Sequence, residues 1–395
     1  IHPLTRAEFV GMTLLHVLIP LLGIAFVAFH AAFARWLLAG IPVKPIRPQV
    51  SYETPVVTIL VAARDEASNL ARLVPALLAQ SYPVDRTQIV IVDDRSSDPT
   101  SQVVRELGQD RVDLVRVDSL PAGMGPKKHA LQQGLGLARG EIVVQIDADN
   151  LPDPDWLSCM ISCFLPRTGA VCGLVLHGPA APHVKKWFHG IWAVEALGWS
   201  AVQAAAIGAG KPISANGGNL AYRRKAFDDV GGFARHQNVI SGDDDFLIQS
   251  LSDSGRWEVI CPEDNRAQLF TAGPESWRQV WEQRKRWGSK CIRYDMERVL
   301  LLGGVYLSYA YVAVVGMFGL WTGWPLAWSI LVASAIVLEA WLLVLRMSIR
   351  TRAKKVLRWF PLAALVQIPL VLAAVVAGTL GKFRWKDGLT RAVRN

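Results

Sequence analysis

A long uncharged run, from Val299 to Leu338, constrains the fold of this chain more than any other feature. An apolar segment of about 20 residues is long enough to cross the ~30 Å hydrocarbon core of a bilayer as a helix. The sequence Thr322-Gly323-Trp324-Pro325 interrupts the run, and Tyr and Trp residues cluster there, as is typical of a membrane–water boundary. The run therefore predicts two membrane spans, over 299–321 and 326–345.

Two further apolar segments predict one span before the polar middle of the chain and one after it. The first, Met12 to Phe33, resembles a signal peptide, but Arg6 is balanced by Glu8 and the apolar run exceeds the usual length, so a retained anchor is favoured. The second covers 360–380. The predicted organisation is an anchor over 1–38, a linker over 39–53, a catalytic domain over 54–290 and a C-terminal membrane region over 291–395.

Hydrophobic residues make up 51% of the chain and the net charge is +9, a balance that could indicate a nucleic-acid partner. Six basic residues, however, lie together beside apolar runs without an acidic partner: Arg346, Arg350, Arg352, Lys354, Lys355 and Arg358. This placement favours a cytosolic loop that faces anionic lipid headgroups. We therefore expect an integral protein of the cell inner membrane with a cytosolic catalytic domain, and no nucleic-acid binding.

Some features fit this topology less well. The basic tail after the last span would lie outside, against the positive-inside rule, so a re-entrant or interfacial helix is the alternative for 360–380. Glu339 lies inside a predicted span, near enough to its Arg346 end to extend toward the membrane surface or to pair, and it is left without an assigned role. The five cysteines are odd in number and form no CxxC pair, which indicates a reduced compartment without a zinc site.

The polar middle alternates predicted strands with helices. Strands are expected over 55–62, 88–92, 112–117 and 141–146, and helices over 69–80 and 127–138. Such alternation predicts an α/β fold with a mainly parallel, doubly wound sheet. Ligands bind beyond the carboxyl ends of such strands, which is where Asp94 and Asp147 are placed. Neither GxGxxG nor GxxxxGK[ST] occurs, so a dinucleotide dehydrogenase and a P-loop ATPase are disfavoured.

Two acidic motifs carry candidate chemistry. Asp147 and Asp149 follow a predicted strand, and in extended backbone residues two apart point to one face, so both could share Mg²⁺ or Mn²⁺. The alternative is a solvated acidic turn. Asp243, Asp244 and Asp245 precede an apolar helix face, and one of the three could serve as the general base for an acceptor hydroxyl.

A basic motif, Gln283-Arg284-Lys285-Arg286-Trp287, lies just before the span that begins near Val299. Arg286 can make bidentate contacts with phosphate, and Trp287 offers a flat face to an acceptor. A basic, Trp-rich helix at a membrane surface is the alternative. The motif places the reaction centre close to the bilayer.

The acidic pair Asp93-Asp94 at the end of a predicted strand precedes these three motifs. The four together, in this order, resemble the motifs of the membrane-anchored family-2 glycosyltransferases with a GT-A catalytic domain, a group that includes ceramide glucosyltransferase and the cellulose and hyaluronan synthases. The resemblance covers roughly residues 54–290. It implies an inverting, metal-dependent transfer of a hexose from a nucleotide sugar, with UDP favoured over GDP.

The resemblance also implies roles for single residues. Asp244 corresponds to the catalytic base and Asp243 to the preceding acid, usually a glutamate. Asp149 corresponds to the principal metal ligand and Asp147 to an acid beside the ribose or diphosphate. The other donor-side positions are Ala63, Arg64, Glu66, Asp93, Asp94, Lys127, Gln283 and Arg286. The acceptor-side positions are Asn216, Gly217, Gly218 and Trp287.

About four spans leave little material for a polymer channel, so a membrane-lipid acceptor that receives one sugar is expected. The segment 185–210, rich in Trp and Ala, is interpreted as an interfacial helix at the headgroups, with a buried helix as the alternative. A processive polysaccharide synthase and a non-catalytic scaffold that binds nucleotide sugars are the other readings. The sequence does not predict an oligomeric state.

Overall fold

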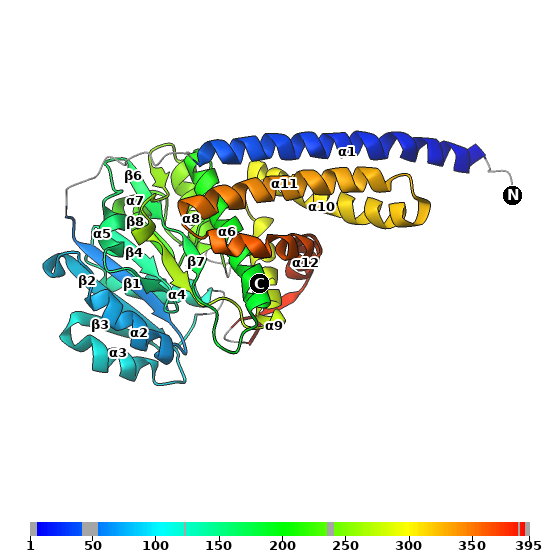
Figure 1. Cartoon of the computed structure of the whole chain (residues 1–395). Coiled ribbons are helices and arrows are strands. Elements are labelled where there is room, and N and C mark those ends of the chain that lie inside the picture. The colour runs from blue at the N-terminus through cyan, green and yellow to red at the C-terminus, as the bar shows by residue number, and fades with distance from the viewer. Residues whose placement is uncertain (1–5, 42–53, 122–123, 235–240, 386–387, 392–395) are drawn as a thin grey trace.

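A computed structural model of the protein shows an α/β domain from which long helices extend (Figure 1). The structure describes residues 6–41, 54–121, 124–234, 241–385 and 388–391. Most of the predicted linker, residues 42–53, lies outside the described residues, as do Lys386 and Arg394 of the basic tail.

A seven-stranded sheet forms the centre of the domain, with strand order β3-β2-β1-β4-β8-β6-β9. The first four of these are mutually parallel, β8 is antiparallel to both β4 and β6, and β9 is parallel to β6. The strands are β1 (Val57–Ala63), β2 (Thr87–Asp94), β3 (Val112–Val117), β4 (Ile142–Ile146), β6 (Thr168–Cys172), β8 (Asn219–Arg223) and β9 (Glu258–Ile260). The predicted α/β fold with a mainly parallel sheet is confirmed.

Helices cover both faces of this sheet because its buried strands present apolar side chains to both sides. Alternate residues of β1 point to opposite faces, so Ile59 packs with Leu73 of α2 (Ala67–Leu78) in one core. Leu60 packs with Leu131 of α4 (Pro126–Leu137) in another. The other short helices are α3 (Thr100–Gly108), α5 (Trp156–Ile161) and α7 (Arg224–Asp229).

A small second sheet lies next to the end of β4. It comprises β5 (Leu151–Pro152), β10 (Leu269–Thr271) and β7 (Val175–His177), in the order β5-β10-β7. Because β5 directly follows the Asp147–Asp149 segment, this sheet brings β10 to the same place. Thr271 of β10 is in register with His177 of β7.

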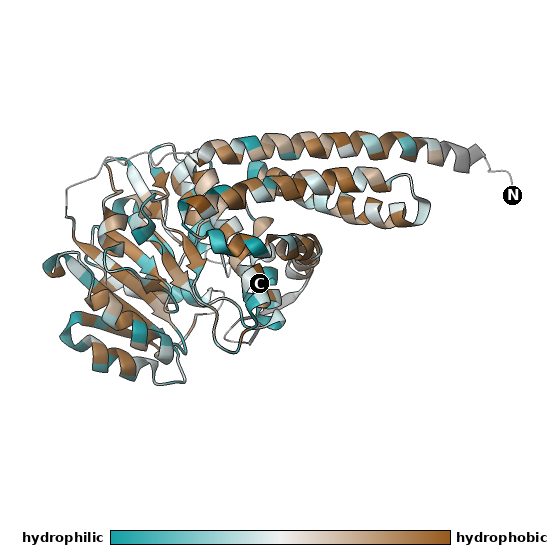
Figure 2. Cartoon of the chain, viewed as in Figure 1, coloured by the Kyte–Doolittle hydropathy of each residue, from teal (hydrophilic) through white to brown (hydrophobic). Residues whose placement is uncertain are grey.

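Within the described ranges, five helices are long and apolar enough to cross a membrane, and they include the four segments that the sequence predicts (Figure 2). They are α1 (Arg6–Gly40), α6 (Lys186–Gly208), α10 (Met296–Thr322), α11 (Leu326–Arg350) and α12 (Phe360–Leu380), the last preceded by a 3₁₀ helix, η5 (Lys354–Trp359). α1 and α10 both pack against α11. The protein is therefore a membrane protein with an α/β domain.

Helix α6 is mostly buried between the sheet and the membrane helices. Trp192 is fully buried in it, whereas Trp187 and Trp199 are partly exposed. The interfacial position expected for 185–210 remains a prediction, and the burial favours its alternative, a core helix.

Helix α12 contacts the domain near both of its ends. Just before its start, Trp359 packs against Gly190 of α6, and near its end Gly378 packs against Lys285 of α9 (Trp277–Cys291). A hairpin of β11 (Lys382–Trp385) and β12 (Gly388–Arg391) follows, and β11 also contacts α9. This arrangement favours the alternative of a re-entrant or interfacial helix, because it returns the basic tail to the domain side.

Candidate active site

The Asp147–Asp149 segment begins where the buried strand β4 ends, at the carboxyl edge of the parallel strands. The two acids lie in a turn, closed by a hydrogen bond from the Asn150 amide to the Asp147 carbonyl at 3.1 Å. The expectation that an extended backbone aligns them is therefore wrong, because the chain has already left the strand. The turn nevertheless keeps the two carboxylates near each other, since the charge of Asp147 acts on Asp149.

Lys127 approaches this turn from the first turn of α4. Gly125 and Pro126 start that helix, with proline in a first-turn position that needs no amide donor. The ammonium group of Lys127 lies 2.7 Å from Oδ1 of Asp147. The positive charge of Lys127 therefore lies beside Asp147. Asp149 interacts with a different residue.

Asp149 accepts a hydrogen bond from the hydroxyl of Thr271 at 2.7 Å. Burial, followed by the neighbouring charges of Asp147 and then Glu66, raises the pKa of Asp149 above its usual value. Negative charge therefore accumulates around this carboxylate. A bound cation would relieve it.

The residues fit a hard divalent cation. The donors are carboxylate oxygens, and Oδ1 of Asn150 is buried without a hydrogen-bond partner. Gly218 leaves the space open, because a Cβ there would lie 2.6 Å from Oδ2 of Asp147. Within the part of the chain that the structure describes, no three acidic, histidine or cysteine side chains form a ready ligand group. An ion held by Asp147 and Asp149 would need oxygens from a ligand as well.

The three acids at the start of α8 (Asp243–Asp253) have different partners. Gly242, with a φ of 92°, turns the chain into the helix. Asp244 accepts a hydrogen bond from the Gly217 amide at 2.8 Å, and Asp245 accepts one from the Ala215 amide at 3.0 Å and one from the Tyr294 hydroxyl at 2.5 Å. Oδ2 of Asp243 is buried without a partner. The helix start is thereby fixed against the segment 215–218.

Their pKa values are shifted in different directions. Burial opposes ionisation of Asp244, but Lys290, Lys127 and the amides of Asp245 and Gly217 outweigh it and lower its pKa. Burial raises the pKa of Asp243, and raises that of Asp245 to about 6. Of the three, Asp244 is the one whose surroundings keep it ionised and able to accept a proton.

Helix α9 supplies cations to the same region. Lys290 forms an ion pair with Asp245 and lies 3.9 Å from Asp244. Burial lowers the pKa of Arg286, while the negative charges of Asp244, Asp147 and Asp243 oppose that effect. The negative charge of both acidic motifs therefore acts on Arg286.

Two other members of the Gln283–Trp287 motif, Arg284 and Trp287, contact α6. Arg284 is buried and donates through Nε to Glu195 at 2.8 Å, and its guanidinium lies 4.2 Å from the ring centre of Trp287. Trp287 also meets the ring of Trp199 at 5.8 Å. Gln283 accepts a hydrogen bond from Arg284 at 2.6 Å. This half of the motif fastens α9 to α6, and the acceptor role of Trp287 and the donor role of Gln283 remain predictions.

The loops after β1 and β2 hold each other at the same edge of the sheet. Ala63 is in register with Asp93. Asp93 is buried and accepts a hydrogen bond from the Ser96 amide at 3.1 Å, and Asp94 pairs with Arg95 at 2.8 Å. Two hydrogen bonds connect the loop after β1 with the segment after β2. The Glu66 amide donates to the Thr100 hydroxyl at 2.9 Å, and Asp65 accepts from the Ser97 amide at 2.7 Å. Asp65 and Arg95 both have a positive φ, at 51° and 59°, which marks strained loops of the kind that gather at ligand sites.

The structure thus brings together the middle of the predicted site. Gly217 touches Asp244 and its neighbour Gly218 touches Asp147, so one short segment joins the two acidic motifs. Asn216 supports the segment by accepting from the Gly218 amide at 2.9 Å. Arg64 contacts its neighbour Asp65 at 3.9 Å and lies with the β1 loop.

Sequence reasoning did not identify Thr271, Lys290 or Tyr294. A signal existed only for Lys290, which follows Arg286 by one helical turn and so lies on the same face of α9. Thr271 and Tyr294 carry no motif, and only the folded chain places them against Asp149 and Asp245.

Comparison with known proteins shows which proteins this chain is similar to. Residues 58–231 match the family model described as Glycosyl transferase family 2. The beta-monoglucosyldiacylglycerol synthase of Trichormus variabilis is 31% identical over 238 residues, which are 59% of this chain and 48% of that protein. The poly-beta-1,6-N-acetyl-D-glucosamine synthase of Staphylococcus epidermidis is 25% identical over 244 residues, 58% of this chain and 53% of that protein. The chain spans about half the length of these relatives.

A solved structure is similar over nearly the whole chain. The mannosyltransferase PcManGT from Pyrobaculum calidifontis, in complex with GDP-Man and Mn²⁺, aligns with a TM-score of 0.58 at 22% identity and covers 92% of this chain and 99% of that one. This likeness shows that the domain has the GT-A fold.

Proposed function

We propose that the chain transfers a single hexose from a nucleotide sugar, a UDP-hexose, to a membrane lipid, because residues 58–231 match the Glycosyl transferase family 2 model. The observation that supports this most directly is the contact of Gly217 with Asp244 and of Gly218 with Asp147. The segment 217–218 thereby contacts both Asp244, the proposed proton acceptor, and Asp147, the acid proposed to lie beside the diphosphate. The catalytic domain in this proposal is residues 54–290.

In the proposed mechanism Asp244 accepts the proton of the acceptor hydroxyl as that oxygen attacks the anomeric carbon. Its lowered pKa keeps it ionised at neutral pH. The bond between the sugar and the diphosphate breaks in the same step, so the anomeric centre is inverted. Asp243 supports the helix start from which Asp244 projects.

The leaving diphosphate requires positive charge. Lys127 and Arg286 approach Asp147 and Asp244 from two different helices, and we assign them to the phosphate oxygens. A Mg²⁺ or Mn²⁺ ion held by Asp149 and Asp147 would stabilise the negative charge that develops on the departing nucleoside diphosphate. The loops that carry Ala63, Arg64, Glu66, Asp93 and Asp94 are assigned to the nucleoside.

A lipid acceptor is supported by the position of the motifs. Helix α9, which carries Arg286, is followed directly by the membrane helix α10 and packs against α12. The relative from Trichormus variabilis is named for glucosylating a diacylglycerol, so we propose a lipid of this class. Asn216, Gly217, Gly218 and Trp287 are assigned to its headgroup. The domain is proposed to lie on the cytosolic side of the inner membrane, where nucleotide sugars are available.

The test is to incubate the purified protein with UDP- or GDP-hexoses, Mg²⁺ or Mn²⁺, and diacylglycerol or a total lipid extract, and to identify the product by mass. Asp244→Asn should lower the rate by roughly 10²–10⁴-fold, the usual contribution of a general base, with nucleotide affinity nearly unchanged. Asp253→Asn on the same helix, where Asp253 pairs with Arg298 at 2.9 Å, is the matched control and should stay active.

Three results would contradict the proposal. A polymeric product would identify a processive synthase instead. Absence of nucleoside diphosphate release with every donor would favour a non-catalytic scaffold. Equal rates for the wild type and Asp244→Asn would exclude Asp244 as the base.

A further inference from the structure

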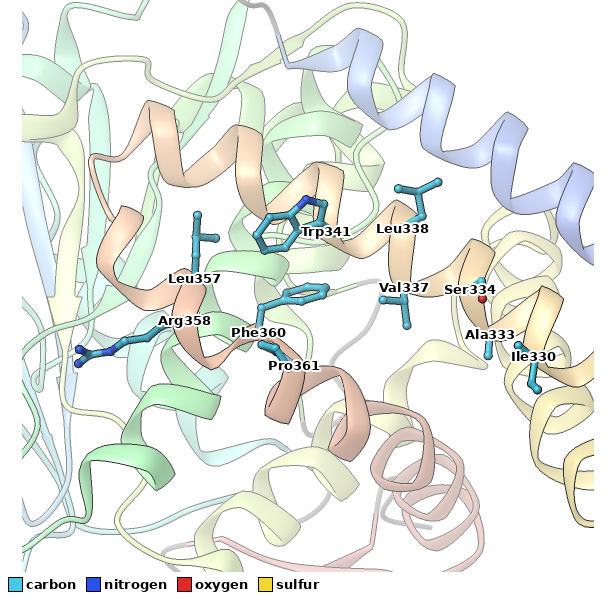
Figure 3. A pocket seen from close by; sticks show the side chains of 10 residues that line it. All are labelled: Ile330, Ala333, Ser334, Val337, Leu338, Trp341, Leu357, Arg358, Phe360 and Pro361. Carbon is cyan, nitrogen blue, oxygen red and sulfur yellow. The ribbon is translucent and has the colours of Figure 1, made fainter. Parts of the chain in front are cut away.

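An apolar groove lies between α11 and the segment where η5 joins α12, away from the acidic motifs (Figure 3). Its volume is about 700 Å³. The rings of Trp341 and Phe360 meet at 5.0 Å on its domain-proximal side. Ile330, Val337 and Leu338 line the rest and are all partly exposed, so the groove opens toward the surroundings of the helix.

The groove has the direction and length of a lipid chain. It follows α11 from Trp341 back to Ile330, which corresponds to roughly 16 Å at the rise of an α-helix. One leaflet of a bilayer has a hydrocarbon depth of about 15 Å, half of the usual core. Because the Trp341 end is nearer the α/β domain, a chain in the groove would belong to the leaflet on that side.

The domain-proximal end of the groove is basic. Arg358 lines it, and in Figure 3 its side chain extends away from the rings of Trp341 and Phe360. Arg358, Lys354 and Lys355 are exposed on η5, and none of the three is in an ion pair with a carboxylate of the described residues. Two basic residues nearby donate to backbone carbonyls instead: Arg346 to that of Ile41, and Arg350 to that of Pro262 at 2.7 Å. The guanidinium of Arg358 lies 5.2 Å from the ring centre of Trp359.

We propose that this groove binds one anionic phospholipid, with an acyl chain along α11 and its phosphate on Arg358, assisted by Lys354 and Lys355. Apolar walls match the chain, and the cationic end matches a negatively charged headgroup. A zwitterionic phospholipid offers the same chain but no net charge, so it should bind more weakly.

The proposed lipid is distinct from the acceptor of the transfer reaction. Pro361 lines the groove, whereas Val375 of the same helix contacts Gly288, next to Trp287. The two positions are separated by roughly 20 Å along α12. Lipid binding in this groove therefore does not depend on sugar transfer at the acidic motifs.

The experiment measures lipid retained by the purified full chain in native mass spectrometry, with dioleoylphosphatidylglycerol and dioleoylphosphatidylcholine at equal concentrations. The wild type should retain one phosphatidylglycerol in preference. Arg358→Gln should lower that preference about fivefold, the effect of one basic residue near a lipid surface. The matched control is Arg352→Gln, because Arg352 is exposed in the same basic segment but does not line the groove.

A second pair of variants tests the apolar walls. Val337→Trp fills the groove and should lower retention of both lipids, whereas Leu331→Trp, at an exposed position of α11 outside the groove, should not. Ala333→Leu narrows the same groove and replaces Val337→Trp if that variant does not fold.

If Arg358→Gln and Arg352→Gln lower the preference for phosphatidylglycerol equally, the preference comes from diffuse surface charge, and the proposal is overturned. Full retention by the groove-filling variants would overturn it as well. No sugar donor or turnover enters the measurement, so a protein that fails to transfer hexose but binds phosphatidylglycerol at Arg358 would contradict only the proposed function.

Discussion

His30 of α1 lies against Glu339 of α11, with Nδ1 and Oε2 separated by 2.5 Å. The other imidazole nitrogen, Nε2, lies 2.8 Å from the hydroxyl of Ser308 on α10. Three membrane helices thus meet through one polar cluster, and His30 and Ser308 are almost completely buried. Arg346, which lies near Glu339 in the sequence, instead donates to the Ile41 carbonyl.

Replacing Glu339 should loosen this helix bundle. We expect Glu339→Ala to destabilise the protein by about 1–2 kcal/mol, the scale of polar contacts between membrane helices, because His30 loses its partner. The measurement is the midpoint of thermal unfolding in detergent. Leu338→Ala, which truncates the neighbouring exposed side chain, is the control, and an equal loss in both variants would show that the polar contact contributes nothing.

Removing Lys290 should change the pH dependence of transfer. After burial, Lys290 has the largest effect on the pKa of Asp244, and it lowers that pKa. Lys290→Met should therefore raise it, so that Asp244 is protonated at a higher pH and the acidic limb of kcat/KM moves upward in pH. The measurement is the pH profile of lipid glycosylation.

Two outcomes test whether Lys290 positions Asp244 and keeps it ionised. Lys290→Arg, which keeps the charge beside Asp245, should restore the position of the acidic limb. An unchanged limb in Lys290→Met would contradict the assignment of Asp244 as the base.

Asp149 should determine cation affinity. Asp149→Asn is expected to weaken Mn²⁺ binding by more than about tenfold, since even residues that merely support metal ligands typically contribute that much. Mn²⁺ titration followed by electron paramagnetic resonance measures this without turnover. Asp153→Asn, an exposed acid just beyond the motif, is the control and should bind Mn²⁺ as the wild type does.

The same titration has a pH dependence. Because the pKa of Asp149 is raised, protons compete with the cation at a higher pH than for an ordinary carboxylate. Apparent Mn²⁺ affinity in the wild type should therefore fall as the pH is lowered. Identical affinity at acidic and neutral pH would argue against Asp149 as a ligand.

The buried pair of Arg284 and Glu195 should be essential for holding α9 on α6. Glu195→Ala leaves the guanidinium without a counter-charge between Trp192 and Trp287 and should cost about 3–5 kcal/mol. Unfolding midpoints of Glu195→Ala, Arg284→Met and the double variant measure it. The double variant should recover part of the loss, and simple additivity would contradict direct coupling.

Local sequence was sufficient to predict the frame of the site. Runs of β-branched residues such as Val57 to Val61 specify buried strands, and an acid directly after such a run falls at the carboxyl edge of a parallel sheet. Asp94 and Asp147 could be placed there for that reason. The long apolar helices could be predicted for an equally local reason, since uncharged length alone determines whether a segment can cross a bilayer.

The contacts between these elements depended on the tertiary structure. Asp244 contacts Gly217, Asp149 contacts Thr271, and His30 contacts Glu339 only when distant segments pack together. No periodic pattern in the sequence between the members of a pair predicts these contacts. The sequence by itself thus determined which residues could bear charge at the edge of the sheet. Only the packing of the folded chain determined which charged groups are neighbours. It thereby determined which acid stays ionised, because burial and the nearest cation set the pKa of each carboxyl group.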